Sequence, residues 1–405
     1  MGVFGAERTR QPAMRESWRA AAIAIAFLAG AQSPTLPQRE LRPTLTLDLR
    51  SVGYEFPGLP SARIGYRILT NKLAFIDNDI LAVSLFVSNP SPEMSVREKV
   101  FGGQYLFETA FFDAKSGKPL RKQTWSNAGR GAGLFPAPGG GFVVWHDLDL
   151  SSYAADGTML KTLALDPKDF PRAVSIHQSP SGEMLFALTL GRGVRVRRIT
   201  TRDLSQLGWL DFVPGFLHGA GSEEYFAFTR QSSPPPYPPR IDVFIVDLSG
   251  DETSMREPKR IFATSSPGCE NISFLDEDTL GLSGSCHALT LIKASGAVLY
   301  QHRFDKEFAG DVIGCQDCGL VLSSTYILGG GGEWRETFPT AKNRKIVLID
   351  GKSGDLRQYP TGPTAKQVSA LSISPNGCRF AEQTDARLDI YDICAPQTGA
   401  GRGTN

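Results

Sequence analysis

Turns that end in glycine recur along the chain, and their spacing constrains the fold more than any other feature. The intervals between successive turn glycines are 40, 93, 46 and 58 residues, and 93 corresponds to about two repeats with a degenerate turn near Leu207-Gly208. A period of this size is typical of stacked or circular repeat architectures. Short segments of alternating apolar residues flank each turn, which indicates hairpins. The turn glycines are Gly117, Gly157, Gly250, Gly296 and Gly354.

A second turn signature precedes the middle of several of the repeats, and an apolar strand follows it each time. It occurs as Ala-Pro-Gly-Gly at residues 137–140, Ser-Pro-Ser-Gly at 179–182 and Ser-Pro-Asn-Gly at 374–377. With these turns the chain resembles the WD40-like and YVTN-like bacterial β-propeller superfamily, whose blades carry an S-P-x-G turn and a D-x-x-x-G turn. The tryptophan-aspartate dipeptide of WD40 blades is missing, so no one functional family is indicated.

The resemblance covers residues 43–396 and implies an all-β fold, a propeller of seven four-stranded blades. The seventh blade is short by one strand. Residues 45–49 alternate cleanly between apolar and polar types, and we expect this N-terminal strand to complete the blade and close the ring. A pair of β-sandwiches and rings of six or eight blades are the alternatives. The expected blades span residues 63–128, 131–168, 171–212, 214–264, 269–307, 309–362 and 365–396.

The N-terminus has the pattern of a targeting segment. Four arginines precede an apolar run over residues 20–31, which ends in Ala-Gly-Ala, a motif typical of signal peptidase sites. We expect a signal peptide at 1–31, a linker at 32–42, a single propeller at 43–396 and a flexible tail at 397–405. The run is shorter than the roughly 20 residues that span a bilayer, so no integral span is expected after cleavage. The protein is therefore expected to be secreted or periplasmic; an uncleaved N-terminal anchor is the alternative.

The charge balance argues against one class of partner. Lys and Arg number 43 and Asp and Glu 42, for a formal charge of +1. A nucleic-acid-binding protein normally shows an excess of basic residues, so nucleic acid is not an expected partner.

All six cysteines lie in the last third of the chain, which agrees with export. Cys269 and Cys286 lie at equal distances from the turn of a predicted hairpin, and so do Cys378 and Cys394. Opposed residues on antiparallel strands are close enough for a disulfide, so we predict these two pairs. Cys315 and Cys318 form a Cys-x-x-Cys motif within one turn. A third disulfide, a redox motif and half of a zinc site are its possible roles.

Three insertions separate the second and third strands of their blades, and strand alternation places all of them on one rim. They lie at residues 89–103, 230–240 and 328–345. Binding residues concentrate on loops that a rigid scaffold presents, so this rim is the predicted binding face. The proline-rich loop of blade four presents Tyr237. The blade-six loop carries Trp334, Arg335 and Phe338, of the kinds that anchor interfaces. A surface insertion without a partner is the alternative.

Catalytic signatures are weak. The glycines at 329–332 lack the Lys-Ser/Thr of a phosphate-binding loop, and no Gly-x-Ser-x-Gly motif occurs. The five histidines show no metal-site spacing, although His177 and His218 lie near the starts of innermost strands. We therefore expect a non-catalytic propeller without a metal or other cofactor, which binds a protein, peptide or glycan through its rim loops. The alternatives are an exported enzyme of the quinone-dependent or lactone-hydrolysing type, with an axial site, and a structural envelope component.

Overall fold

A computed structural model describes residues 41–54, 71–89, 104–127, 131–170, 174–190, 194–212, 216–232, 240–248, 257–265, 268–284, 286–315, 319–329, 340–351, 354–361, 370–384 and 386–394. All of them belong to one compact unit, Arg39–Asn405. The expected signal peptide and the C-terminal tail lie outside the described residues and stay predictions. Within the described ranges no helix has the length and apolar character that crossing a membrane requires.

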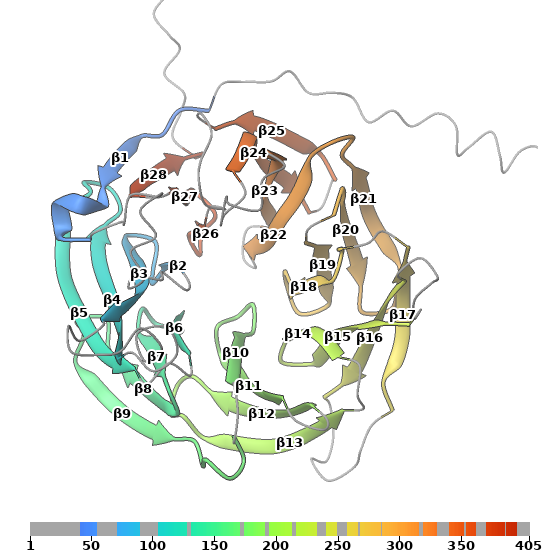
Figure 1. Cartoon of the computed structure of the whole chain (residues 1–405), viewed down its shortest axis with the longest axis horizontal. Coiled ribbons are helices and arrows are strands. Elements are labelled where there is room, and N and C mark those ends of the chain that lie inside the picture. Colours follow the sequence, from blue (N-terminus) through green and yellow to red (C-terminus); the bar gives the residue numbers. More distant parts are fainter. Residues whose placement is uncertain are drawn as a thin grey trace, which may run out of the picture. The chain divides into compact units, whose positions relative to one another are not determined.

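Seven four-stranded antiparallel sheets surround a common axis, as Figure 1 shows. Blade one contains β2 (Asn71–Phe75), β3 (Ile80–Asn89), β4 (Gln104–Asp113) and β5 (Pro119–Asn127), and blade two contains β6 (Ala132–Pro136), β7 (Phe142–His146), β8 (Asp149–Tyr153) and β9 (Met159–Ala164). Blade three contains β10 (Val174–Gln178), β11 (Met184–Leu190), β12 (Val194–Thr200) and β13 (Gln206–Phe212), and blade four contains β14 (Phe216–Gly221), β15 (Tyr225–Gln231), β16 (Ile241–Asp247) and β17 (Lys259–Thr264). Blade five contains β18 (Asn271–Phe274), β19 (Thr279–Ser283), β20 (Ala288–Lys293) and β21 (Val298–Arg303), and blade six contains β22 (Phe308–Cys315), β23 (Leu320–Gly329), β24 (Thr340–Asp350) and β25 (Leu356–Pro360). Blade seven contains β26 (Ala370–Ile373), β27 (Arg379–Thr384), β28 (Arg387–Asp392) and, from the N-terminal end of the described chain, β1 (Leu45–Asp48).

The predicted closure of the ring is confirmed. β1 pairs with β28, from Leu45 opposite Ile390 to Asp48 opposite Arg387, and gives blade seven its outermost strand. A 3-10 helix then begins at Leu49, where the expected strand ended. The all-β, seven-bladed prediction is therefore correct, and the first and last strands of the described chain pair in one sheet.

The hydrophobic core is divided among the interfaces between neighbouring blades. One cluster packs β1 and blade seven against blade one, and six further clusters fill the remaining interfaces in turn. The second strand of blade two, Phe142–His146, is buried along most of its length, whereas the outer strand of the same blade, Met159–Ala164, is largely exposed. Each blade is therefore stabilised mainly by its neighbours.

Among the described residues, the turn between the third and fourth strands follows the predicted glycine pattern in blades one, two, five and six and departs from it in blade three; Gly250 of blade four lies outside the described residues. In blade one Gly117 has φ +71° and its amide donates to Asp113 O at 2.8 Å. In blade three the turn was expected near Leu207-Gly208, but these residues lie inside β13. Leu204 closes that turn instead. It has φ +54°, and its amide donates a hydrogen bond to Thr200 O at 3.1 Å. Its side chain is buried between blades two and three, which explains a leucine where blades one, two, five and six have glycine.

The structure contains the two disulfides whose pairing the hairpins predict. Cys269 and Cys286 have Cα atoms 5.1 Å apart, and Cys378 and Cys394 have Cα atoms 5.0 Å apart. Cys315 is also disulfide-bonded. Cys318 lies outside the described residues.

Candidate functional site

The connections between strands divide the propeller into two faces. The turns joining strands one and two, and three and four, lie on one face, which we call the turn face. The connections joining strands two and three lie on the opposite face, which we call the loop face. This division follows from the antiparallel order of every sheet.

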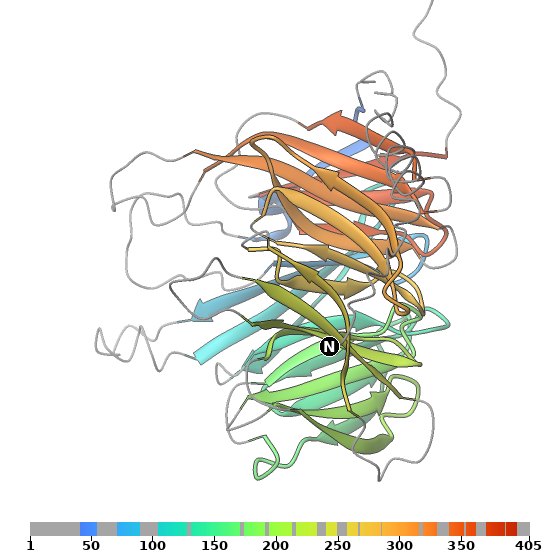
Figure 2. The same ribbon diagram turned by 90° about the vertical axis from the view of Figure 1, so that its right-hand side faces the viewer.

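Two hairpins extend the loop face beyond the rest of the ring. β3 and β23 each have ten residues, whereas the corresponding strand of blade three, β11, has seven. Three extra residues at about 3.3 Å each lengthen a hairpin by roughly 10 Å. In Figure 2 both hairpins extend to the left, past the neighbouring strands. They belong to blades one and six, which flank blade seven.

The predicted rim residues lie outside the described residues. Tyr237 belongs to the connection between β15 and β16, and Trp334, Arg335 and Phe338 belong to the connection between β23 and β24. The strands that lead into these connections do end on the loop face, as the alternation argument requires. The rim site itself stays a prediction.

A buried ion pair fixes the blade-six hairpin to blade seven. The pairing of β23 with β24 shifts between Thr325 and Ile327, and Asn343, in this bulge, has φ +49°. The adjoining residue, Arg344, reaches across the blade interface and donates from Nη2 to Oε1 of Glu382 on β27. Bulges commonly re-aim a side chain in this way. Sequence reasoning missed the pair because its members are 38 positions apart and neither belongs to a motif.

A cavity of about 580 Å³ opens on the turn face near the axis. Residues from blades one, two, three, six and seven line it, among them the three proline-glycine turns that marked the repeats. In the sequence, these turns indicate only the repeats of a propeller. Their convergence on one cavity cannot be predicted from the sequence, because it depends on the closure of the ring.

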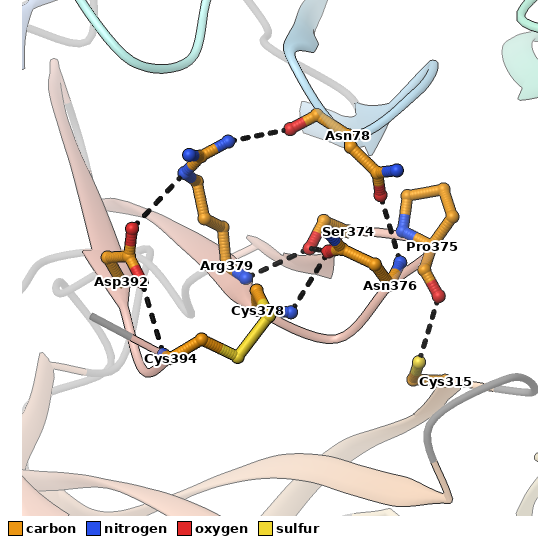
Figure 3. The surroundings of a disulfide bond; sticks show 9 residues. All are labelled: Asn78, Cys315, Ser374, Pro375, Asn376, Cys378, Arg379, Asp392 and Cys394. Carbon is orange, nitrogen blue, oxygen red and sulfur yellow. Dashed lines mark hydrogen bonds and ion pairs between the residues drawn. A yellow bond between two sulfur atoms is a disulfide. The ribbon is translucent and has the colours of Figure 1, made fainter. Parts of the chain in front are cut away.

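Hydrogen bonds between blades hold the turns of this face in place. Gln178 of blade three donates to Pro136 O of blade two. Asn78 of blade one accepts from the amide of Asn376 in blade seven at 2.9 Å and, through its carbonyl, from Arg379 at 2.9 Å. Figure 3 shows the two contacts of Asn78 beside the Cys378–Cys394 disulfide. These hydrogen bonds therefore join turns of the cavity wall across the boundaries between blades.

Two glutamates share a site where the turns of blades three, four and five meet. Ser181 donates to Oε1 of Glu223, and the amide of Glu223 donates to Oε2 of Glu277 at 3.1 Å. Burial, followed by the hydrogen bond and the charge of Glu223, raises the pKa of Glu277 to about 8. The neighbouring Asp276 has the turn role expected from sequence, since its Oδ1 accepts the amides of Asp278 and Thr279.

The two histidines singled out from sequence lie on innermost strands but have separate surroundings. A ring nitrogen of His177 lies 3.4 Å from Ser175 Oγ on β10. Nε2 of His218 on β14 lies 3.8 Å from Oε1 of Glu270. No three His, Cys, Asp or Glu side chains in the described ranges gather in a geometry that could hold a metal ion.

These observations define the class of the protein, a seven-bladed β-propeller closed by its N-terminal strand. The structure is similar to the WD40 domain of Pan2 from Neurospora crassa, with a TM-score of 0.54, 9% identity and coverage of 89% of this chain and 98% of that one. It is also similar to a chain in the crystal structure of the mitotic checkpoint complex, with a TM-score of 0.51, 14% identity and coverage of 90% and 99%. These likenesses concern the fold. No protein-family model matches the chain, and no curated protein matches it.

Proposed function

We propose that the protein is an exported, non-catalytic binding module that binds a protein, peptide or glycan through the loop face. The observation that carries this proposal is the pair of hairpins, β3–β4 and β23–β24, that project from one face on either side of blade seven. Long loops on a rigid scaffold are common binding elements. The connection at the tip of the blade-six hairpin carries Trp334, Arg335 and Phe338, side chains of the type that anchor interfaces.

Two further features support the proposal. The ion pair between Arg344 and Glu382 holds the base of the blade-six hairpin, so less ordering is needed when a ligand binds. The disulfides support export, because such bonds persist in oxidising compartments. The apolar N-terminal segment with its Ala-Gly-Ala motif is the expected export signal.

The test shortens the loops without disturbing the sheets. Gly329 and Thr340 are directly paired, and so are Asn89 and Gln104, so an Asn-Gly turn can replace residues 330–339 or 90–103. Peptides selected from a random display library, and glycans retained on an array, are measured against the wild type and both variants. We expect at least a tenfold loss of affinity in the blade-six variant and in Trp334→Ala.

A variant on the other face is the matched control. Glu183→Gln changes an exposed residue of the turn face and should leave every affinity unchanged. Ligands that bind both shortened variants as tightly as the wild type would contradict the proposal.

An exported propeller enzyme with an axial site, of the quinone-dependent or lactone-hydrolysing type, is the second candidate. The cavity near the axis favours it. A native mass spectrum of the mature protein separates the candidates, since the mass of a bound metal or quinone would support the enzyme.

A further inference from the structure

We propose that the axial cavity of the turn face is a second binding site, which takes the lysine or arginine side chain of an extended peptide. The cavity lies on the face opposite to the projecting hairpins, so this proposal is independent of the loop-face function. It is based on the charge of the wall, on the carboxylate oxygen of Asp77 as an acceptor, and on the apolar side chains of the lining.

The charge of the wall is negative. Apart from the disulfide-bonded Cys315, Asp77 is the one ionisable side chain among the described residues that line the cavity. Its Oδ1 accepts the amides of Asp79 and Ile80, each at 2.7 Å. Its Oδ2 has no hydrogen bond within the described part of the chain and faces Gly140, in the wall contributed by blade two, where an added Cβ would lie 3.8 Å away. One carboxylate oxygen is thus available to a cation.

The proline turns of the wall supply few backbone hydrogen-bond donors, and the side-chain donors of the lining include those of Asn78 and Ser372. Prolines from blades two, three and seven line the cavity, and proline has no backbone N–H. The side-chain amide of Gln178 already donates to Pro136 O and Gly182 O. Ammonium and guanidinium groups only donate hydrogen bonds, so either can bind Asp77 Oδ2. The lining prolines are Pro136, Pro138, Pro180 and Pro375.

Apolar side chains complete the site. Leu73, Phe75, Leu371 and Ile373 contribute to the lining and are otherwise buried. Lysine and arginine have the matching character, since a methylene stem packs on apolar surface while the charged head finds a polar partner. Asp77 is the one carboxylate among the described lining residues, which suits a ligand with one positive charge. A polyamine would leave its other ammonium groups without a carboxylate among the described lining residues.

The nearest basic side chains do not oppose a cation. Lys115 and Arg379 both contact Asp79 Oδ1, at 2.9 and 3.1 Å. Arg379 also lies 3.6 Å from Asp392, as Figure 3 shows. On the other side of the cavity, the lining residue Ser181 donates to Oε1 of Glu223, which contributes a negative charge, whereas Glu277, with its pKa raised to about 8, is protonated at neutral pH. The charge that surrounds the cavity therefore complements a basic peptide.

The experiment measures the binding of four capped pentapeptides of sequence Gly-Gly-X-Gly-Gly, in which X is lysine, arginine, norleucine or glutamate. We expect the lysine and arginine probes to bind at least tenfold more tightly than the norleucine probe. Their affinity should fall as salt is raised, because screening weakens an attraction between charges near the surface.

Three variants locate the site. Asp77→Asn keeps an oxygen that accepts the two turn amides but removes the charge, and should weaken the lysine probe about tenfold. Asp276→Asn is the matched control, because Asp276 accepts two turn amides in the same way in blade five and lies outside this lining. Ala137→Trp places a large side chain in the wall and should abolish binding of the probes.

Two results would overturn the proposal. One is a norleucine probe that binds as well as the lysine probe, or an Asp77→Asn variant that behaves like Asp276→Asn. The other is spermidine binding more tightly than the lysine probe with the same dependence on Asp77, which would assign the cavity to a free polyamine. Neither result bears on the shortened-loop variants, so the loop-face function is tested separately.

Discussion

Arg344 of blade six and Glu382 of blade seven form an ion pair that is almost completely removed from water, with side chains 6% and 2% exposed. Burying two charges costs desolvation free energy that their attraction offsets only in good geometry. The pair is therefore weak evidence for stability by itself. Its position at the bulge of the projecting hairpin gives it a different role, which is to fix where that hairpin meets blade seven.

Removing one member of this pair should lower the free energy of unfolding far more than replacing both members. Glu382→Leu leaves the guanidinium buried without its counter-charge, which typically costs about 3–5 kcal/mol of unfolding free energy. The double variant Arg344→Met with Glu382→Leu replaces the pair by apolar side chains, and we expect it to recover most of that loss. Urea unfolding of the three proteins measures the effect. A double variant as unstable as the single one would show that the pair itself supplies the stability.

The Glu223–Glu277 pair should make stability fall as the pH rises. The pKa of Glu277 is raised to about 8, above its unfolded value of 4.5, so the folded protein holds a proton that the unfolded chain releases. The stabilisation is fully present below about pH 4.5 and is lost as the pH rises through about 8. Glu277→Gln is neutral at every pH and should remove this part of the slope, as measured by urea midpoints between pH 6 and 9. Glu183→Gln should keep the wild-type slope; an unchanged slope in Glu277→Gln would contradict the assignment.

Local turn chemistry made most of the fold predictable. A glycine such as Gly117 closes a hairpin with positive φ, and glycine is the residue that adopts this conformation at least cost, so the pattern is visible in sequence. The strand that begins at Leu45 was also predictable, because the seventh blade lacks one strand in the sequence pattern and an edge strand without a neighbour would stay exposed. Blade three departs from the pattern because Leu204 adopts a strained positive φ while its side chain is buried. No sequence rule predicts a leucine at such a turn position.

The contacts between blades were not predictable in the same way. Asn78 and Asn376 join the two ends of the ring, 298 positions apart, and Arg344 meets Glu382 through a bulge. Each contact depends on the rotation from one blade to the next. Asp77 and Asp276 look alike as turn residues in sequence, yet only Asp77 lines the axial cavity. Their positions in the ring, which cannot be read from the sequence, determine which of the two aspartates lines the cavity.

Each of the two hairpin disulfides should contribute a similar stability. They close loops with sequence separations of 17 and 16 residues, for which the chain-entropy model gives about 3 kcal/mol. The double variants Cys269→Ser/Cys286→Ser and Cys378→Ser/Cys394→Ser should therefore lose comparable unfolding free energy. Urea unfolding under oxidising conditions checks this. A loss confined to one pair would mean that the other stabilises the unfolded chain as much as the folded one.

The turn of blade three allows a test in which glycine should be better than alanine. Leu204 has φ +54°, a conformation that costs a residue with a Cβ about 1–2 kcal/mol, and its side chain is 2% exposed. Leu204→Ala removes the buried side chain, at a cost of about 2–5 kcal/mol, and keeps the backbone strain. Leu204→Gly removes both, so its unfolding free energy should exceed that of the alanine variant by about 1 kcal/mol. At Gly117 the added Cβ of Gly117→Ala would lie 2.6 Å from Leu47 Cδ2, so alanine should also destabilise there. If alanine proved better than glycine at position 204, the side chain at that turn would be held by packing alone, without the strain that the backbone angle implies.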